Sequence, residues 1–272
     1  MRNFLVAVTL AFAAIAAPSA WAQSAEEQRQ LDWVFKRGQL LFVLDRAAWV
    51  ATDDFAERVG DLGALGSLGY IVDRNAQGFT TLFFSRDGDK FVAIYRARIG
   101  ANGVVDPEVF ARGSRPELTP VQARMARAVL GVRETKLSGC SGSNPNISIV
   151  PPDNPQAPLD VYITASQMRD GHFEFGAHHR LSFDAQGREI SRRAFTKSCL
   201  SAPVPSQDER KAGAMLGVSH LLDPLPTEVH VFIAMAAEQQ IGVITENPRR
   251  LWGVSVEGIR LLQDNPPAFP DE

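Results

Sequence analysis

From residue 159 onward the sequence consists of short apolar stretches separated by turn signals, and this pattern restricts the fold more than any other feature. Turns such as Asp184-Ala185-Gln186-Gly187 join the stretches. Short segments of this kind, joined by tight turns, are typical of antiparallel β-sheets. We therefore predict strands at residues 161–165, 173–183, 188–198, 228–235, 241–245 and 251–256.

Two helix N-termini are visible in the first half of the chain. Ser24 and Glu27 form the S-x-x-E pattern of a capping box, and apolar residues at helical spacing follow, which predicts a helix over residues 25–37. Thr119-Pro120-Val121-Gln122 combines a cap, a proline at the first helical position and a glutamine three residues on. It predicts a second helix that extends to about residue 130.

The end of the first helix is ambiguous in the sequence. Gly38 is a candidate terminus, because residues 40–44 would equally fit the start of a strand. Thr52-Asp53-Asp54 predicts the start of a separate short helix over residues 55–59. The N-terminal half is thus expected to hold two or three helices.

A β-hairpin is predicted between the two helices. Residues 79–85 and 90–98 flank the turn Arg86-Asp87-Gly88-Asp89. Alternation places four apolar side chains on one face of this hairpin: Leu82, Phe84, Val92 and Ile94.

Together these elements predict an α+β fold that is predominantly antiparallel β-sheet. Residues 23–262 are expected to form one domain, although the Ser-, Asn-, Gly- and Pro-rich stretch at 139–158 would also suit a junction between two lobes. Residues 263–272 form a proline-rich tail that we expect to be flexible.

The first 22 residues have the pattern of a cleavable export signal. Arg2 supplies a positive charge, residues 4–17 are nearly all apolar, and Ala20-Trp21-Ala22 ends in a small-x-small motif. We predict cleavage after Ala22. The apolar run is short for a membrane span, and the mature chain has no second run of spanning length. The expected location is the bacterial periplasm or the exterior, with no integral membrane segment in the mature chain.

Composition narrows the class of partner. Hydrophobic residues make up 45% of the chain and charged residues 22%, which excludes wholesale disorder. The formal net charge is −3, and no long block of like charge occurs. A nucleic acid or an anionic membrane is therefore not an expected partner.

The chain has two cysteines, Cys140 and Cys199. In an oxidising compartment two cysteines usually pair, so we predict a disulfide between them. Cys140 lies in a Ser- and Gly-rich segment that would also suit an exposed catalytic thiol, but an unpaired exported thiolate would be oxidised. We favour the structural bridge.

All five histidines lie between residues 172 and 230, and imidazole is both the commonest metal ligand and the usual neutral-pH base. If residues 173–183 form a single strand, Glu174 and His178 share its polar face, and His230 on a neighbouring strand would complete a zinc site. Glu174 and His178 would then be roughly 13 Å apart unless the backbone bulges at Gly176. The alternative is a solvated strand face with ordinary polar residues and with His179 hydrogen-bonded in the core.

The remaining acid–base candidates are Asp45, Asp53 and Asp54, although helix capping at residues 52–54 would explain two of them. We find neither a nucleophile elbow nor a phosphate-binding loop.

Three segments resemble blocks of an uncharacterised family of exported bacterial proteins. They are Asp45-Arg46-Ala47-Ala48-Trp49 with Thr52-Asp53, Phe195-Thr196-Lys197-Ser198-Cys199-Leu200, and Pro226-Thr227-Glu228-Val229-His230-Val231-Phe232. The resemblance would span most of the mature chain. It implies export and one shared architecture, and it implies no activity.

These observations predict an exported soluble protein without a cofactor, which binds an unknown protein or small-molecule ligand or supports the envelope. The alternative is a metal-assisted hydrolase that holds zinc with His178, His230 and Glu174.

Overall fold

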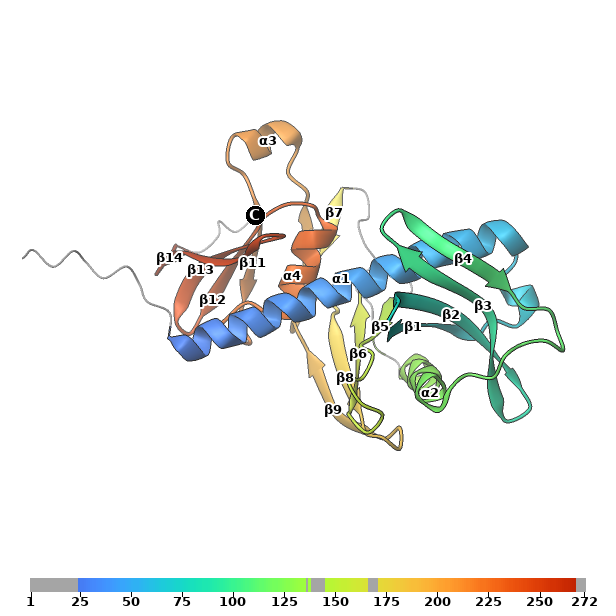
Figure 1. Ribbon diagram of the computed structural model, residues 1–272. Helices are drawn as coiled ribbons and strands as arrows, with labels where there is room; N and C mark the ends of the chain where they lie inside the picture. The colour runs from blue at the N-terminus through green and yellow to red at the C-terminus, as the bar shows by residue number, and fades with distance from the viewer. Residues whose placement is uncertain (1–23, 136, 138–144, 166–170, 268–272) are drawn as a thin grey trace, which may run out of the picture.

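The computed structural model describes residues 24–135, 137, 145–165 and 171–267 (Figure 1). The predicted signal at residues 1–22 lies outside this range. The helices of the described residues are α1 (Ala25–Val59), α2 (Pro120–Glu134), α3 (Gln207–Lys211), α4 (Glu228–Ala236) and the short 3-10 helix η1 (Gly63–Leu65).

The strands form three four-stranded sheets and one small pair. The first sheet has the order β1 (Gly69–Asn75), β2 (Gly78–Asp87), β3 (Lys90–Gly100) and β4 (Gly103–Val109). The second has the order β5 (Asn146–Ile149), β6 (Leu159–Thr164), β8 (His179–Phe183) and β9 (Glu189–Ala194). The third has the order β11 (Leu216–His220), β12 (Ile241–Glu246), β13 (Arg249–Ser255) and β14 (Gly258–Asp264), and the pair consists of β7 (His172–Glu174) and β10 (Ser201–Pro203).

The predicted α+β fold with mainly antiparallel sheets is confirmed. All neighbouring strands within the sheets pair antiparallel except β11 and β12, which are parallel. The chain segment between those two contains α4, because a parallel pair needs a crossover connection. The strands predicted at residues 161–165, 188–198, 241–245 and 251–256 correspond to β6, β9, β12 and β13.

Helix α1 is one continuous helix of 35 residues, so the predicted break at Gly38 and the predicted second start at residues 52–54 are wrong. Gly38 lies where α1 crosses α4. A Cβ added there would lie 2.4 Å from the Cβ of Val231 and 2.6 Å from the carbonyl oxygen of Glu228. The glycine therefore allows close contact between two helices, and it does not end one.

Helix α1 contacts the sheets at both ends of the molecule. Figure 1 shows it running along the length of the protein, with β11–β14 near its N-terminal part and β1–β4 near its C-terminal part. Leu31 and Leu41 belong to a large cluster of buried residues with α4, β12 and β13. Phe55, near the other end, packs with Phe83 and Tyr95 of the first sheet.

Helix α2 lies between the first and second sheets. Its buried residues, including Met125 and Val129, form a cluster with Ile71 of β1 and with Val161 and Leu181 of the second sheet. The predicted start at Thr119 is confirmed, because the Thr119 side chain accepts from the backbone of Gln122, whose side chain accepts in return. The helix continues to Glu134.

The predicted hairpin is confirmed as β2 and β3, but its predicted faces are wrong. The turn places Phe84 directly opposite Ala93 and Ser85 directly opposite Val92, and directly opposite residues share a face of the sheet. Leu82 and Phe84 therefore share a cluster with Phe91 and Ala93, whereas Ile94 belongs to the cluster on the other face.

The strand predicted at residues 228–235 is wrong, because this segment is helix α4. All eight residues are buried, so the helix has no solvent-exposed polar face. Its sequence therefore lacks the alternation of apolar and polar residues every 3.6 positions that marks an amphipathic helix. The alternating β-branched residues Val229, Val231 and Ile233 give this segment the sequence pattern of a strand.

The single strand predicted at residues 173–183 is also wrong, because β7 and β8 are separate strands in separate sheets. Ala177 has a positive φ of 58°, which interrupts extended backbone. Gly176 lies against the backbone of the segment before β10, where an added Cβ would lie 2.7 Å from the carbonyl oxygen of Ser198. The assumption that alternate residues of this stretch share one face therefore fails.

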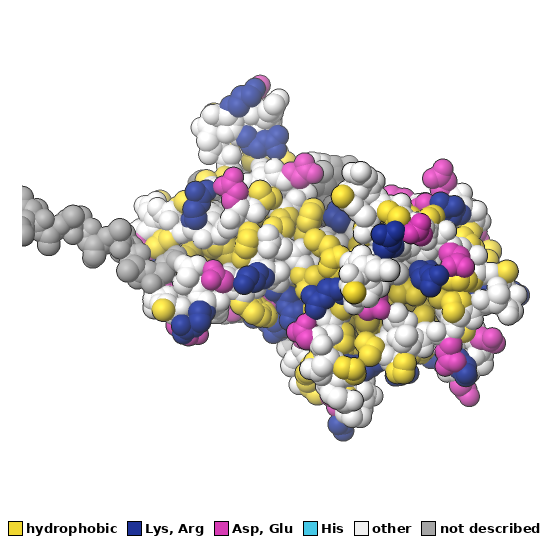
Figure 2. Space-filling model, in the orientation of Figure 1, with side chains coloured by type: hydrophobic (Ala, Val, Ile, Leu, Met, Phe, Trp, Pro, Cys, Tyr) yellow, Lys and Arg dark blue, Asp and Glu magenta, His cyan; other side chains and the backbone are white. Residues whose placement is uncertain are grey.

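Positive and negative side chains are interspersed on the surface. Figure 2 shows Lys and Arg beside Asp and Glu across the visible face. Ion pairs of the described residues include Arg96 with Glu108 and Lys90 with Glu117. Among the described residues, no helix has the length and apolar character needed to cross a membrane.

Candidate functional site

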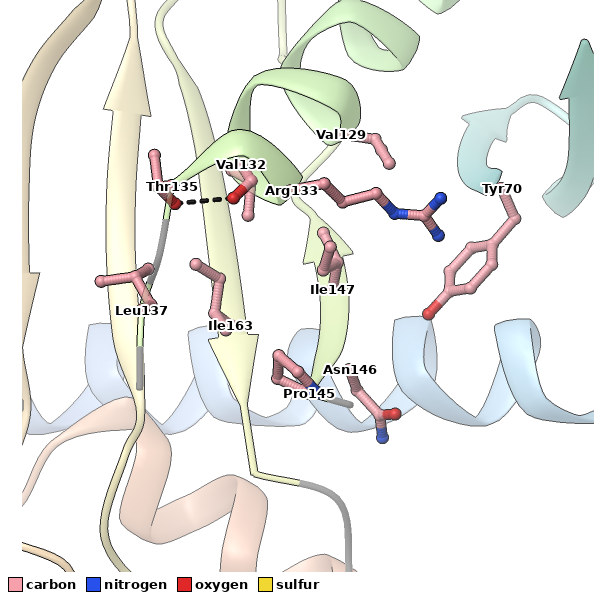
Figure 3. A pocket seen from close by; sticks show the side chains of 10 residues that line it. All are labelled: Tyr70, Val129, Val132, Arg133, Thr135, Leu137, Pro145, Asn146, Ile147 and Ile163. Carbon is pink, nitrogen blue, oxygen red and sulfur yellow. Dashed lines mark hydrogen bonds between the residues drawn. The ribbon is translucent and has the colours of Figure 1, made fainter. Parts of the chain in front are cut away.

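The best-formed cavity lies where the edge strands of two sheets meet. Strand β1 is the edge of the first sheet, β5 is the edge of the second, and the C-terminal end of α2 lies over both. The cavity has a volume of about 550 Å³. Figure 3 shows its lining side chains, and we call it the β1–β5 pocket: Tyr70, Val129, Val132, Arg133, Thr135, Leu137, Pro145, Asn146, Ile147 and Ile163.

The walls of the β1–β5 pocket are mainly branched aliphatic side chains. Val129 and Val132 of α2 and Ile163 of β6 are buried, and Ile147 of β5 is half-buried. Leu137 and Pro145 lie at the two ends of residues 138–144, which are outside the described part of the chain. Apolar walls with a few polar groups are the usual composition of a small-molecule site.

The side chains of two of the four polar lining residues donate hydrogen bonds to other parts of the protein. The Thr135 hydroxyl donates to the carbonyl oxygen of Val132 at 2.6 Å. The Asn146 side-chain amide donates to Asp45 Oδ1 at 3.0 Å. These two residues therefore shape the pocket, and Tyr70 and Arg133 remain as the groups that face a ligand with a polar end.

The Tyr70 hydroxyl is held in its neutral form. Burial raises the pKa of Tyr70 to about 12, and the nearby carboxyl of Asp45 adds to the shift. A backbone hydrogen bond from Ile147 and the charge of Arg133 oppose it. Tyr70 therefore presents a phenol close to the Arg133 guanidinium, as Figure 3 also shows.

Arg133 lies in the last turn of α2, where a cation interacts favourably with the helix dipole. Its Nη1 donates to the carbonyl oxygen of Leu68. Within the described residues no acidic side chain forms an ion pair with it. Arg133 is exposed at the mouth of the pocket, so its remaining donors are accessible.

Asp45 lies behind the pocket on α1. Burial raises the pKa of its carboxyl, and the hydrogen bond from Asn146 and the charge of Arg46 act in the opposite direction. Of the three acid–base candidates in the sequence, Asp45 is the one next to the pocket. Asp53 is exposed, and Asp54 pairs with Arg58 at 2.7 Å and accepts from the Tyr95 hydroxyl at 2.7 Å.

The structure places the three predicted zinc ligands in different local environments. His178 precedes β8, and both of its ring nitrogens contact backbone: Nδ1 accepts from the N–H of Ala165 at 3.3 Å, and Nε2 lies 3.1 Å from the carbonyl oxygen of Glu174. Glu174 thus meets His178 through its backbone. One of these hydrogen bonds would have to break before His178 could bind a metal.

His230 has a structural role at the start of α4. Its Nδ1 accepts from the backbone N–H of Thr227 at 2.9 Å, the position that Glu or Gln takes in a capping box. Its ring meets that of His220 edge to face, with centroids 4.7 Å apart, and His220 in turn contacts Asp223 at 2.7 Å.

His178 and His230 are neutral at ordinary pH. Burial lowers the pKa of His178 to about 4. Burial also lowers the pKa of His230 well below its ordinary value, and the charge of His220 adds to the shift. When folding lowers the pKa of a histidine, the free energy of unfolding is highest above the pKa of the unfolded state. It decreases as the pH falls from there towards the lower pKa of the folded state.

Glu228, two residues before His230, is occupied by other side chains. It is buried, and its Oε1 accepts from the Tyr162 hydroxyl at 2.8 Å and from Arg180 at 3.2 Å. Across the ranges that the structure describes, no three His, Cys, Asp or Glu side chains are arranged to hold one metal ion.

The predicted disulfide involves a residue outside the described range. Cys199 lies in the exposed segment before β10, and Cys140 belongs to residues 138–144. The Cys140–Cys199 bridge therefore remains a prediction.

Comparison of the chain with protein-family models, curated proteins and solved structures finds no match. The interpretation of the site therefore rests on its geometry.

Proposed function

We propose that this chain is an exported, non-enzymatic binding protein that holds a small molecule in the β1–β5 pocket. The observation that carries the proposal is the pocket itself, whose volume of about 550 Å³ lies within the range of roughly 300–1,000 Å³ typical of small-molecule sites. Its aliphatic walls and few polar groups also support this function.

The arrangement favours binding over catalysis. The pocket presents a neutral phenol and one guanidinium. The Asp45 carboxyl bonds to Asn146 behind the pocket, and Asp45 is not one of the lining residues. General acid–base catalysis is most efficient when the pKa of the group lies near the working pH, and the pKa of Tyr70, raised to about 12, lies far above it.

Export is supported by residues 1–22, which combine a positive charge, an apolar run and a small-x-small motif. N-terminal sequencing of protein recovered from the periplasm or the medium should begin at Gln23. Recovery of chain that begins at Met1 in the cytosol would contradict this part of the proposal.

The binding function is tested with a small-molecule library and two matched variants. Ile147→Trp places a large ring in the pocket, and Ile190→Trp makes the same change on an exposed position of β9. Compounds that raise the melting temperature of the wild type should do the same for I190W and lose their effect on I147W. If no compound binds, or if binding is equal in both variants, the β1–β5 pocket is not a binding site.

A further inference from the structure

The charge of the β1–β5 pocket restricts the ligands that it can take. Arg133 is the one charged side chain among the ten lining residues, and none of them is acidic. Asp45, behind the pocket, accepts a hydrogen bond from Asn146, and no carboxylate of the described residues forms an ion pair with Arg133. The positive charge at the mouth of the pocket is therefore not neutralised by the described residues.

Arg133 and Tyr70 together form a polar end. The Leu68 carbonyl takes one guanidinium nitrogen, which leaves further N–H groups free. A guanidinium presents its donors in a planar fork that matches the two oxygens of a carboxylate. The neutral Tyr70 hydroxyl, close to that fork, can donate a third hydrogen bond.

The rest of the pocket wall is aliphatic. Val129, Val132, Ile147 and Ile163 come from three different elements, and each presents a branched hydrocarbon. Such walls are complementary to an alkyl body and offer no polar partner to a hydroxyl-rich one, whose unpaired groups would lose their water. A single cation also fits one negative charge better than the two of a phosphate monoester.

We propose that the β1–β5 pocket binds a monocarboxylate with an aliphatic body, with its carboxylate at Arg133 and Tyr70 and its chain along the aliphatic wall. This assignment rests on the binding function proposed above. Arg133 also contacts the Leu68 backbone, so the test must separate a contribution to binding from a contribution to the fold.

The first arm of the test compares ligands on the unaltered protein by isothermal titration calorimetry. Octanoate and 1-octanol have the same number of carbon atoms and differ in the charge of the head group. Octanoate should bind at least about tenfold more tightly, since a charge-assisted hydrogen bond contributes more than a neutral one. Its binding should also weaken as salt is added, whereas that of octanol should not.

The second arm uses variants of two arginines on the same helix. Arg133→Gln should weaken octanoate binding by about tenfold and leave octanol binding unchanged. Arg127→Gln removes a cation from an exposed position of α2 outside the pocket, and octanoate binding should change by less than about twofold. Unchanged octanol binding shows that R133Q is folded.

The outcomes distinguish this inference from the function on which it rests. If octanol binds wild type as tightly as octanoate, or if R133Q binds octanoate normally, the carboxylate assignment is overturned and the pocket remains a binding site. If neither compound binds while other library compounds do, the ligand class is wrong. If nothing binds, both proposals fail.

Discussion

Replacing Gly38 by alanine tests the contact between α1 and α4. The added Cβ would lie 2.4 Å from the Cβ of Val231 and 2.6 Å from the Glu228 carbonyl oxygen, and neither atom can rotate away. Overpacking of this kind costs about 3 kcal/mol at the upper end of its usual range. Alanine is a better helix former than glycine, and this difference stabilises the folded state by about 1 kcal/mol. We therefore expect Gly38→Ala to lower the free energy of unfolding by about 2 kcal/mol.

Gly131→Ala is the matched control for this prediction. Gly131 lies inside α2, and a Cβ added there meets no atom within 4 Å. Only the helix propensity changes, so G131A should be more stable than wild type by about 0.5 to 1 kcal/mol. Urea unfolding monitored by circular dichroism measures both variants, and the slope m should stay constant. If G38A is stabilised as much as G131A, α1 and α4 do not cross at this glycine.

Three other perturbations address the buried histidine, the buried glutamate and the cysteines. His178 by itself should lower the unfolding free energy by about 3 kcal/mol as the pH decreases from 6.5 to 4, because folding lowers its pKa from 6.5 to about 4. His178→Gln should reduce this slope, and an unchanged pH profile would contradict the assignment. Tyr162→Phe leaves Glu228 with one partner and should cost about 1 to 2 kcal/mol in urea unfolding, so a loss within experimental error would argue against the buried hydrogen bond. Alkylation of the non-reduced mature protein should label neither cysteine, and Cys199→Ser should cost about 4 kcal/mol for a closed loop of roughly 60 residues; labelling of both cysteines would disprove the bridge.

The sequence predicted those features of the fold that depend on neighbouring residues. The N-termini of α1 and α2 were predicted correctly, because each capping box lies within four residues of sequence. The β2–β3 hairpin followed from the turn between its strands for the same reason.

Features that depend on distant residues were mispredicted. Gly38 resembles a helix terminus when only its neighbours in the sequence are considered. A glycine is needed there because Val231, far away in the sequence, packs against it. Helix α4 is buried on all sides, so its apolar pattern has no period that would distinguish a helix from a strand. The surrounding sheets and α1 bury this helix, so its burial cannot be predicted from the residues of the segment alone.

The candidate site was only partly visible in the sequence. Asp45 was among the acid–base candidates, and the structure places it next to the β1–β5 pocket. Tyr70 and Arg133 were missed, because they lie far apart in the sequence and meet only where α2 packs against β1. The histidine cluster was the stronger signal in the sequence, but two of its members, His178 and His230, are hydrogen-bonded to the backbone.

The N-terminal position of α1 affects how long its apolar face is exposed during synthesis of the chain. Its apolar stripe is synthesised first, and the residues of α4, β12 and β13 that cover part of it come from the last fifth of the chain. A nascent chain must therefore carry an uncovered hydrophobic helix through nearly all of translation, and such surfaces invite aggregation. We expect yield in recombinant expression to depend strongly on chaperones that shield this segment, more than on the stability of the finished protein.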